Sequence, residues 1–190
     1  MASKDQEIEI KSAVSKKDFL RIEKYLQDNA KFVKSSKQVD TYYSPKNKLF
    51  LKPKYPYEWL SIRDRNNKAI LNYKHWCPEG VSDTTHCDEY ETDLGSKNQA
   101  HKLLLALKFE KLVTVEKERR IFVKNNLEVS LDNLKFLGYF VEIESLDNKG
   151  GIRQTRKRIL EFAKKLGFKK IVHIPGGYAA ELMRKKGLMK

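Results

Sequence analysis

The sequence predicts an α+β fold in which an antiparallel sheet of many short strands is covered by three or four helices. Several segments alternate polar and apolar residues with a period of two, the pattern of a strand whose two faces differ. Other segments carry apolar residues at helical spacing. The chain has 190 residues, 40% of them hydrophobic, which is enough for one domain with a real core and excludes general disorder.

The first half of the chain opens with a strictly alternating segment at residues 7–11, which predicts a strand. A helix is predicted at residues 15–28, because Ser15 suits the N-cap position and apolar residues follow at helical spacing. Residues 46–57 contain Pro53 and Pro56 and are predicted to form a loop or an edge hairpin. Further strands are expected at residues 38–43, 59–65, 69–76 and 86–94, with a turn at residues 66–67.

The second half mixes helices and strands. A helix is predicted at residues 97–107, with Ala100, Leu103, Leu104 and Leu107 facing inward. Strands follow at residues 112–123, 127–131 and 139–143, then a basic amphipathic helix at 152–166 and a short helix at 178–186. The sequence has no internal repeat and no low-complexity linker, which excludes a solenoid.

Charge is distributed unevenly along the chain. The net charge is +14, and residues 149–190 alone contribute +11 of it, so the first 148 residues are nearly neutral. Such a balance favours anionic partners. The simplest interpretation of the C-terminal excess is a solvated basic helix face, and the alternative is a docking surface for RNA or another polyanion.

The cysteine count and the hydropathy pattern bear on the compartment. Cys77 and Cys87 are too few for a disulfide scaffold, which favours a reducing environment. No apolar run approaches the ~18 residues that a membrane-spanning helix needs, and the N-terminus lacks a signal-peptide core. We therefore expect a cytoplasmic protein that does not contact membranes.

The predicted strands carry an unusual number of charges on one face. In a strand, residues i, i+2 and i+4 share a face. An ordinary solvated face with cross-strand ion pairs is the alternative for any one strand. Helices, however, need the apolar face to pack on, so the charged face must line something else, as inside a closed barrel. The charged face collects Glu7, Glu9, Lys11, Arg63, Arg65, Lys74, Glu89, Glu91, Lys117, Arg119, Asp132, Glu142 and Glu144.

Such a face suits a particular class of ligand. Carboxylates at i and i+2 suit a hard divalent cation. Lysines and arginines suit a chain of phosphates. The two occur together when the ligand is a metal-bound triphosphate.

Seven ordered segments resemble those of the CYTH superfamily, the triphosphate tunnel metalloenzymes. The resemblance covers residues 5–145 and implies an eight-stranded antiparallel closed β-barrel with helices packed outside, as one domain over residues 1–190 with basic helices at 149–190. The segments are Glu7-x-Glu9-x-Lys11, Gln38-x-Asp40-Thr41-Tyr42-Tyr43, Leu60-x-Ile62-Arg63 with Tyr73-Lys74, Asp88-Glu89-Tyr90-Glu91, Val115-x-Lys117-x-Arg119, Leu131-Asp132 and Leu137-Gly138-x-Phe140-x-Glu142-Ile143-Glu144.

The resemblance also implies roles for individual residues. Where the family often has Leu-Arg-Ile-Arg, this chain has Ser61 in place of the first arginine, and Arg65, in phase, is the candidate substitute. Tyr178 is expected to close one end of the tunnel. The implied ligands of Mg²⁺ or Mn²⁺ are Glu7, Glu9, Asp132, Glu142 and Glu144. The implied triphosphate-binding residues are Lys11, Arg63, Arg65, Lys74, Lys117 and Arg119, of which Lys11, Lys74 and Arg119 are the candidate catalytic residues.

Three functions follow from the resemblance and the charge. The leading one is a class IV adenylyl cyclase that converts ATP to cyclic AMP and pyrophosphate. The second is a triphosphatase acting on tripolyphosphate, thiamine triphosphate or a nucleoside triphosphate. The third is a catalytically silent module that binds RNA or polyphosphate through the basic C-terminal region. The oligomeric state is not determined by the sequence, and a homodimer is one of the alternatives.

Two other kinds of site find little support in the sequence. His75, Cys77, His86 and Cys87 fit no standard zinc-ligand spacing. A P-loop motif is absent, which argues against a P-loop nucleotide site.

Overall fold

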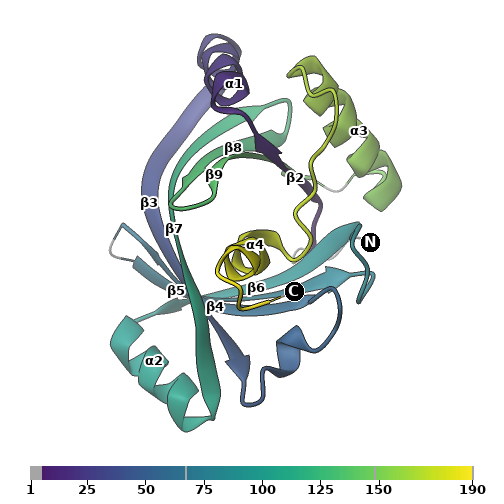
Figure 1. Ribbon diagram of the computed structural model, residues 1–190. Helices are drawn as coiled ribbons and strands as arrows, with labels where there is room; N and C mark the ends of the chain where they lie inside the picture. Colours follow the sequence, from purple (N-terminus) through teal and green to yellow (C-terminus); the bar gives the residue numbers. More distant parts are fainter. Residues whose placement is uncertain (1–5, 67, 148, 190) are drawn as a thin grey trace.

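The computed structural model describes residues 6–66, 68–147 and 149–189. Nine strands of this part form one antiparallel sheet that curls into a nearly closed barrel (Figure 1). The strands are β1 (Gln6–Glu7), β2 (Glu9–Val14), β3 (Lys31–Pro45), β4 (Glu58–Arg65), β5 (Lys68–Cys77), β6 (His86–Leu94), β7 (Phe109–Lys124), β8 (Leu127–Leu134) and β9 (Gly138–Ser145). The helices are α1 (Lys16–Asn29), α2 (Lys97–Ala106), α3 (Gly151–Lys165) and α4 (Gly177–Lys185), with a 3-10 turn at Leu49–Leu51.

The N-terminal segment closes the barrel. The sheet order is β1-β6-β5-β4-β3-β7-β8-β9-β2, so its two ends are β1 and β2. Only Ile8 separates these strands, and they pair with β6 and β9 respectively. The predicted α+β barrel is therefore confirmed, and the ninth strand arises because the single strand expected at residues 7–11 is interrupted at Ile8. Closure removes the exposed sheet edges that would otherwise pair with other chains.

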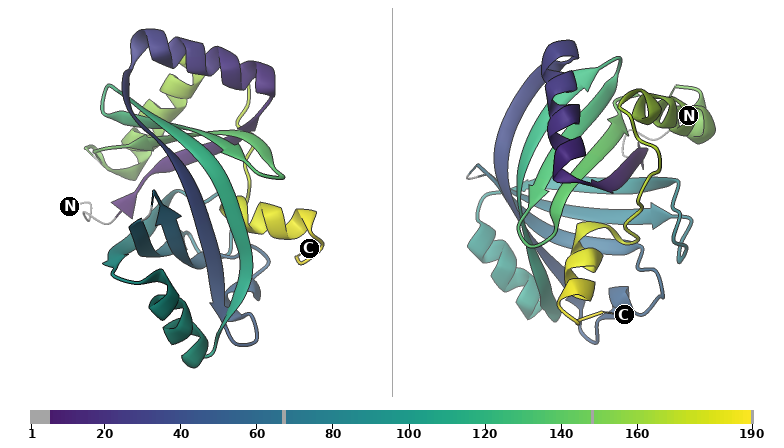
Figure 2. Two further views of the ribbon diagram at one scale, coloured as in Figure 1. Left: turned by 90° about the vertical axis from the view of Figure 1, so that its left-hand side faces the viewer. Right: turned by 45° about the horizontal axis from the view of Figure 1, so that its top comes forward.

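The two longest strands, β3 and β7, pair along their length and form one side of the barrel (Figure 2, left). Register shifts between Phe32 and Lys34 and between Thr41 and Tyr43 let β3 bend as it follows β7. The sequence predicts only residues 38–43 as a strand here. The additional residues before Gln38 lack an alternating pattern, with Phe32 and Val33 exposed, so pairing with β7 is what makes them a strand.

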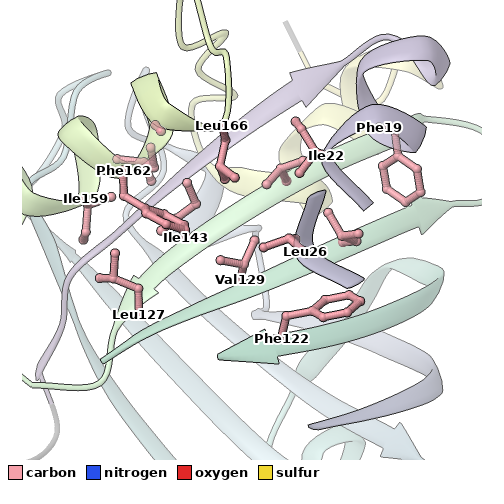
Figure 3. Close-up of a cluster of buried hydrophobic side chains, with 14 of the residues drawn as sticks. Phe19, Ile22, Leu26, Phe122, Leu127, Val129, Ile143, Ile159, Phe162 and Leu166 are labelled. Atoms are coloured by element: carbon pink, nitrogen blue, oxygen red, sulfur yellow. The ribbon is translucent and has the colours of Figure 1, made fainter. Parts of the chain in front are cut away.

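Helices α1 and α3 cover the outer, apolar face of the sheet (Figure 3). Ile22 and Leu26 of α1 and Ile159 and Phe162 of α3 are buried in one cluster with strand residues such as Val129. The predicted N-cap is confirmed, because the Ser15 hydroxyl accepts a hydrogen bond from the Asp18 amide at 3.1 Å.

Helix α2 buries less than its pattern predicts. Ala100 and Leu104 pack beside Tyr43, whereas Leu103 and Leu107 are 63% and 67% exposed, so their inward orientation was predicted wrongly. The reason is geometric. Residues 100 and 104 lie one turn apart on the stripe facing the sheet, and the adjacent stripe of this corner helix has no layer above it (Figure 1).

Helix α4 lies across the opening of the ring of strands (Figure 1). Its Tyr178, Leu182 and Met183 pack against Trp59 and Phe140, which project from the inner faces of β4 and β9. An apolar plug therefore seals one end of the barrel, as expected for Tyr178. Within the described residues no helix is long and apolar enough to cross a membrane.

Candidate functional site

The inner face of the barrel encloses a cavity of about 190 Å³. Its walls hold eleven of the thirteen residues predicted for the charged face, and the other two, Glu9 and Asp132, are buried directly beside it. The charged residues lining the cavity are Glu7, Lys11, Lys34, Asp40, Arg63, Arg65, Lys74, Glu89, Glu91, Lys117, Arg119, Glu128, Glu142 and Glu144.

Three glutamates form a carboxylate cluster between β2 and β9. Antiparallel pairing sets Glu9 opposite Glu144, and Glu142 lies two residues away on the same face. One carboxylate oxygen from each of the three lies within 4.8 Å of the others. Glu9 Oε2 is buried and has no hydrogen-bond partner. A buried carboxylate oxygen without a partner is costly, so the geometry favours a bound cation.

The electrostatics of this cluster lead to the same conclusion. Burial, together with Glu9 and Glu142, raises the pKa of Glu144 to about 8. Burial alone would also raise the pKa of Glu142, but Arg119 and Lys11 hold it well below its usual range. Lys11 Nζ lies 2.9 Å from Glu9 Oε1 and 3.0 Å from Glu142 Oε2. Among the described residues, Glu144 is the member of the cluster that forms no ion pair, and Lys74 lowers its pKa less than burial raises it. An all-oxygen donor set suits Mg²⁺ or Mn²⁺.

Arg119 anchors an ion-paired wall on β7, β8 and β9. Its Nε and Nη2 donate to Asp132 Oδ1 and Oδ2 at 2.7 and 2.6 Å, and its Nη1 and Nη2 donate to Glu142 at 3.2 and 3.0 Å. Asp132 is fully buried and also accepts a hydrogen bond from the Tyr178 hydroxyl at 2.8 Å. The structure therefore engages Asp132 with Arg119 and Tyr178 and does not place it in the carboxylate cluster.

Glu7 is likewise held by a basic residue. The Lys74 ammonium is hydrogen-bonded to Glu7 and lies 3.2 Å from Glu89 Oε1. Burial raises the pKa of Glu7 well above its usual range despite Lys74. Glu89, although burial opposes its ionisation, has a pKa lowered to about 2 by Lys74. Glu7 lines the cavity but stands outside the group of three glutamates.

The remaining predicted cations differ in how well they are paired. Arg63 donates to Asp40 Oδ1 at 3.1 Å and to Glu91 Oε1 at 2.8 Å. Lys117 Nζ stays 3.8 and 3.9 Å from the nearest carboxylate oxygens, and burial together with Arg119 lowers its pKa to about 8. The Nε atom of Arg65 is buried without a hydrogen-bond partner. Lys117 and Arg65 are therefore cations with room for an anion.

Several cavity residues were not assigned a role from the sequence. Strand phase could have identified most of them. Asn72 lies two residues before Lys74, Glu128 lies four residues before Asp132, and Asp40 lies within one of the predicted strand motifs. Lys34 lies in the part of β3 that the pattern did not predict. Ser61 is buried, its hydroxyl lacks a partner, and it does not line the cavity, whereas Arg65 lines the cavity from the same face of β4. The others are Tyr42, Trp59, Trp76, Glu89 and Glu91.

Comparisons with known proteins agree with this architecture. The family model described as the CYTH domain matches residues 5–178. The Methanocaldococcus jannaschii protein named "Putative adenylate cyclase MJ0240" is 27% identical over 165 residues, which cover 86% of this chain and 91% of that protein.

Solved structures show the same fold. A conserved hypothetical protein from Pyrococcus furiosus superposes with a TM-score of 0.73 at 26% identity, covering 91% of this chain and 98% of that one. HpAC1 from Hippeastrum, described as a "putative adenylyl cyclase" with a dominant triphosphatase activity, superposes with a TM-score of 0.66 at 18% identity, covering 97% of both chains. This second likeness is one of fold.

Proposed function

Because this chain belongs to the CYTH domain family, we propose that it is a metal-dependent enzyme that hydrolyses a triphosphate held inside the barrel. One observation carries the proposal: in the part of the chain that the structure describes, a carboxylate at one wall of the cavity forms no ion pair, and two basic side chains at another wall are incompletely paired. Within the described residues Glu144 forms no ion pair, whereas buried Lys117 and half-buried Arg65 have incomplete partners. A metal-bound triphosphate supplies both charges at once.

In this proposal the metal is held by the carboxylate cluster of Glu9, Glu142 and Glu144. The oxygen donors fit Mg²⁺ or Mn²⁺, and Glu9 Oε2 is an unused buried ligand atom. A metal bound there polarises a phosphate oxygen and lowers the pKa of a bound water. Asp132 contributes by positioning Arg119, and Glu7 by holding Lys74 at the cavity.

The triphosphate-binding role falls to the six basic residues predicted for it. Lys11, Lys74 and Arg119 each touch a carboxylate that lines the cavity, so they are placed to neutralise charge as it develops on the phosphate oxygens. Lys117 and Arg65 supply the least neutralised positive charge. Hydrolysis breaks the bond to the terminal phosphorus, with water as nucleophile and the remaining phosphates as leaving group. The set is Lys11, Arg63, Arg65, Lys74, Lys117 and Arg119.

Cavity size favours the triphosphatase over the cyclase. Pockets that bury a drug-sized ligand have volumes of about 300–1,000 Å³. This cavity measures about 190 Å³ and is closed at one end by Tyr178 and its neighbours on α4. Such a space suits a chain of phosphates better than a whole nucleotide.

Adenylyl cyclase activity is the second candidate, because a place for an organic group adjoins the cavity. A smaller hollow of about 50 Å³ shares Lys11 and Trp76 with the tunnel and has apolar walls at Ile174 and Pro175. A relative named as an adenylate cyclase is 27% identical. In this case the ribose 3′-hydroxyl attacks the α-phosphorus and pyrophosphate leaves.

One incubation tests both candidates. The full chain is mixed separately with tripolyphosphate, thiamine triphosphate and ATP, each with Mg²⁺ or Mn²⁺, and the products are resolved. Orthophosphate is the expected product, and cyclic AMP with pyrophosphate would establish the cyclase instead. No metal-dependent turnover of any substrate would overturn the proposal that the protein is an enzyme.

The basic C-terminal region supports a rival proposal, a module that binds RNA or polyphosphate. Helix α3 buries Ile159 and Phe162 and leaves Lys157, Lys164 and Lys165 exposed. Changing these three lysines to glutamate should abolish RNA binding if the rival holds, and should leave tripolyphosphate turnover nearly intact if the tunnel is the active site. Arg156 is excluded from the test because its guanidinium donates to the Thr84 carbonyl at 2.8 Å.

A further inference from the structure

A second group of potential metal ligands lies outside the tunnel, on the outer face of β5 and β6. His75 and Cys77 alternate along β5 with Lys74 and Trp76, which line the tunnel. The register sets His75 opposite Asp88 of β6. One ligand atom from each of His75, Cys77 and Asp88 lies within 4.8 Å of the others. Two paired strands thus bring a nitrogen, a sulfur and an oxygen donor together.

We propose that His75, Cys77 and Asp88 form a binding site for a zinc-class transition metal ion, separate from the carboxylate cluster in the tunnel. Imidazole, thiolate and carboxylate are the ligands that Zn²⁺ takes in proteins, usually in tetrahedral geometry. Mg²⁺ prefers oxygen ligands in an octahedral arrangement and is a poor match. Three protein ligands leave one tetrahedral position, which a water molecule fills.

The surroundings of the three ligands favour a cation. Glu79 Oε1 lies 3.0 Å from His75 Nε2, a carboxylate–imidazole contact of the kind that orients metal-bound histidines. Within residues 6–66, 68–147 and 149–189, no lysine or arginine forms an ion pair with Glu79 or Asp88. Both cysteines are free thiols. The carboxylates beside the three ligands therefore have no ion pair with a lysine or arginine of the described residues, and the local charge favours a cation.

The position of this site suggests what it does. The ligands come from two neighbouring strands, so a bound ion links β5 to β6. Their tunnel-facing neighbours are Lys74 on β5 and Glu89 on β6, which are 3.2 Å apart. Asp88 also pairs with Gln6 of β1, the strand that closes the barrel. The ion would thus stabilise the wall at its point of closure. This inference does not depend on the proposed catalytic activity.

Cobalt binding gives a direct test. Titration of the full chain with Co²⁺ in excess Mg²⁺ should produce a near-ultraviolet thiolate-to-cobalt charge-transfer band, since a thiolate is a soft ligand that Mg²⁺ does not take. Cys77→Ser should abolish the band. The matched control is Cys87→Ser, because Cys87 is buried beside Glu7 and Lys74 on the opposite face. A band that survives Cys77→Ser, or no band in the unmodified chain, would overturn the proposal.

Thermal unfolding provides a second measurement that does not rely on the thiol. Zn²⁺ at about a hundredfold excess over its dissociation constant should raise the unfolding midpoint by roughly 5–10 °C. Asp88→Asn, a half-buried residue whose change preserves shape, should lose most of this rise, and His173→Gln should keep it. His173 is the control because its Nε2 lies 3.7 Å from Asp83 and it belongs to neither group of potential ligands found among the described residues. An equal rise in Asp88→Asn would contradict the site.

Discussion

The carboxylate cluster on β2 and β9 and the ion-paired wall around Arg119 lie on the same inner face of the barrel, yet their charges are balanced differently. Asp132 accepts three hydrogen bonds, two from Arg119 and one from Tyr178. Glu144 instead has a pKa raised to about 8 by burial and by neighbouring glutamates. An acidic side chain that faces the inside of the barrel is therefore not necessarily available as a metal ligand. The number of cations already within reach decides which carboxylates remain available.

The largest expected effect comes from removing the centre of the ion-paired wall. Arg119→Met should lower the free energy of unfolding by about 3–5 kcal/mol, because Asp132 is left buried without its main partner. Denaturant unfolding measures the loss. Arg65→Met is the matched control, since Arg65 lines the same cavity with its Nε unpaired, and it should cost little or nothing. Equal losses of unfolding free energy in the two variants would show that ion pairing of the cation does not determine its contribution to stability.

The carboxylate cluster should respond in metal affinity more than in stability. Glu9→Gln keeps the shape of the side chain but removes a charge from the group of three. The Mg²⁺ or Mn²⁺ concentration for half-maximal turnover should rise at least about tenfold, and turnover should fall. Glu128→Gln changes a cavity carboxylate outside that group and should have a much smaller effect. A larger effect at Glu128 would place the metal elsewhere.

Lys74 separates phosphate binding from metal binding. Lys74→Met removes a positive charge between Glu7 and Glu89, so the KM for tripolyphosphate should rise several-fold or turnover should fall. Metal affinity of the free protein should stay the same or increase, because the carboxylates then have one competing cation fewer. Isothermal titration with Mn²⁺ measures this. Loss of metal binding in Lys74→Met, with Glu9→Gln fully active, would mean that the two roles are reversed.

The smallest effect, counted per pH unit, is a pH dependence of stability to which Glu144 of the carboxylate cluster contributes. Burial raises the folded-state pKa of Glu144 to about 8. Without metal, the folded state therefore holds a proton that the unfolded chain releases above its ordinary pKa. The stabilisation that comes from protonated Glu144 is present at low pH and is lost as pH rises towards 8. The loss is at most on the order of 1 kcal/mol for each pH unit.

Two measurements check this pH dependence. The stability of the metal-free protein between pH 5 and pH 8 should decline with pH, and Glu144→Gln should make the decline shallower, while the share that comes from Glu7 remains. Apparent Mg²⁺ affinity should increase over the same interval, because the proton must leave before the metal binds. A metal affinity independent of pH would remove Glu144 from the ligand set.

Much of the barrel could be predicted from the sequence because strand phase is a local property. The alternation around Glu7, Arg63, Lys117 and Glu142 determines which side chains face inward, whatever the strands pair with. The N-cap at Ser15 and the helices at the C-terminus are equally local. Where no alternation exists, as in the first half of β3, or where a helix lies at a corner, as at Leu103, the local pattern failed.

Which inward-facing side chains form ion pairs with one another depends, in contrast, on the register between strands that are far apart in sequence. Only the tertiary structure shows that Arg119 donates hydrogen bonds to Asp132 and that Lys74 donates one to Glu7. It alone shows that ligand atoms of His75, Cys77 and Asp88 lie close together. It also shows that the N-terminal strand is interrupted at Ile8, so that β1 pairs with β6 and β2 pairs with β9. A one-residue change of register would redirect every one of these contacts, and no single strand's sequence contains that information. The sequence by itself thus determined most of the charged residues that face the tunnel, and the fold determined which of them are available to a metal and a triphosphate.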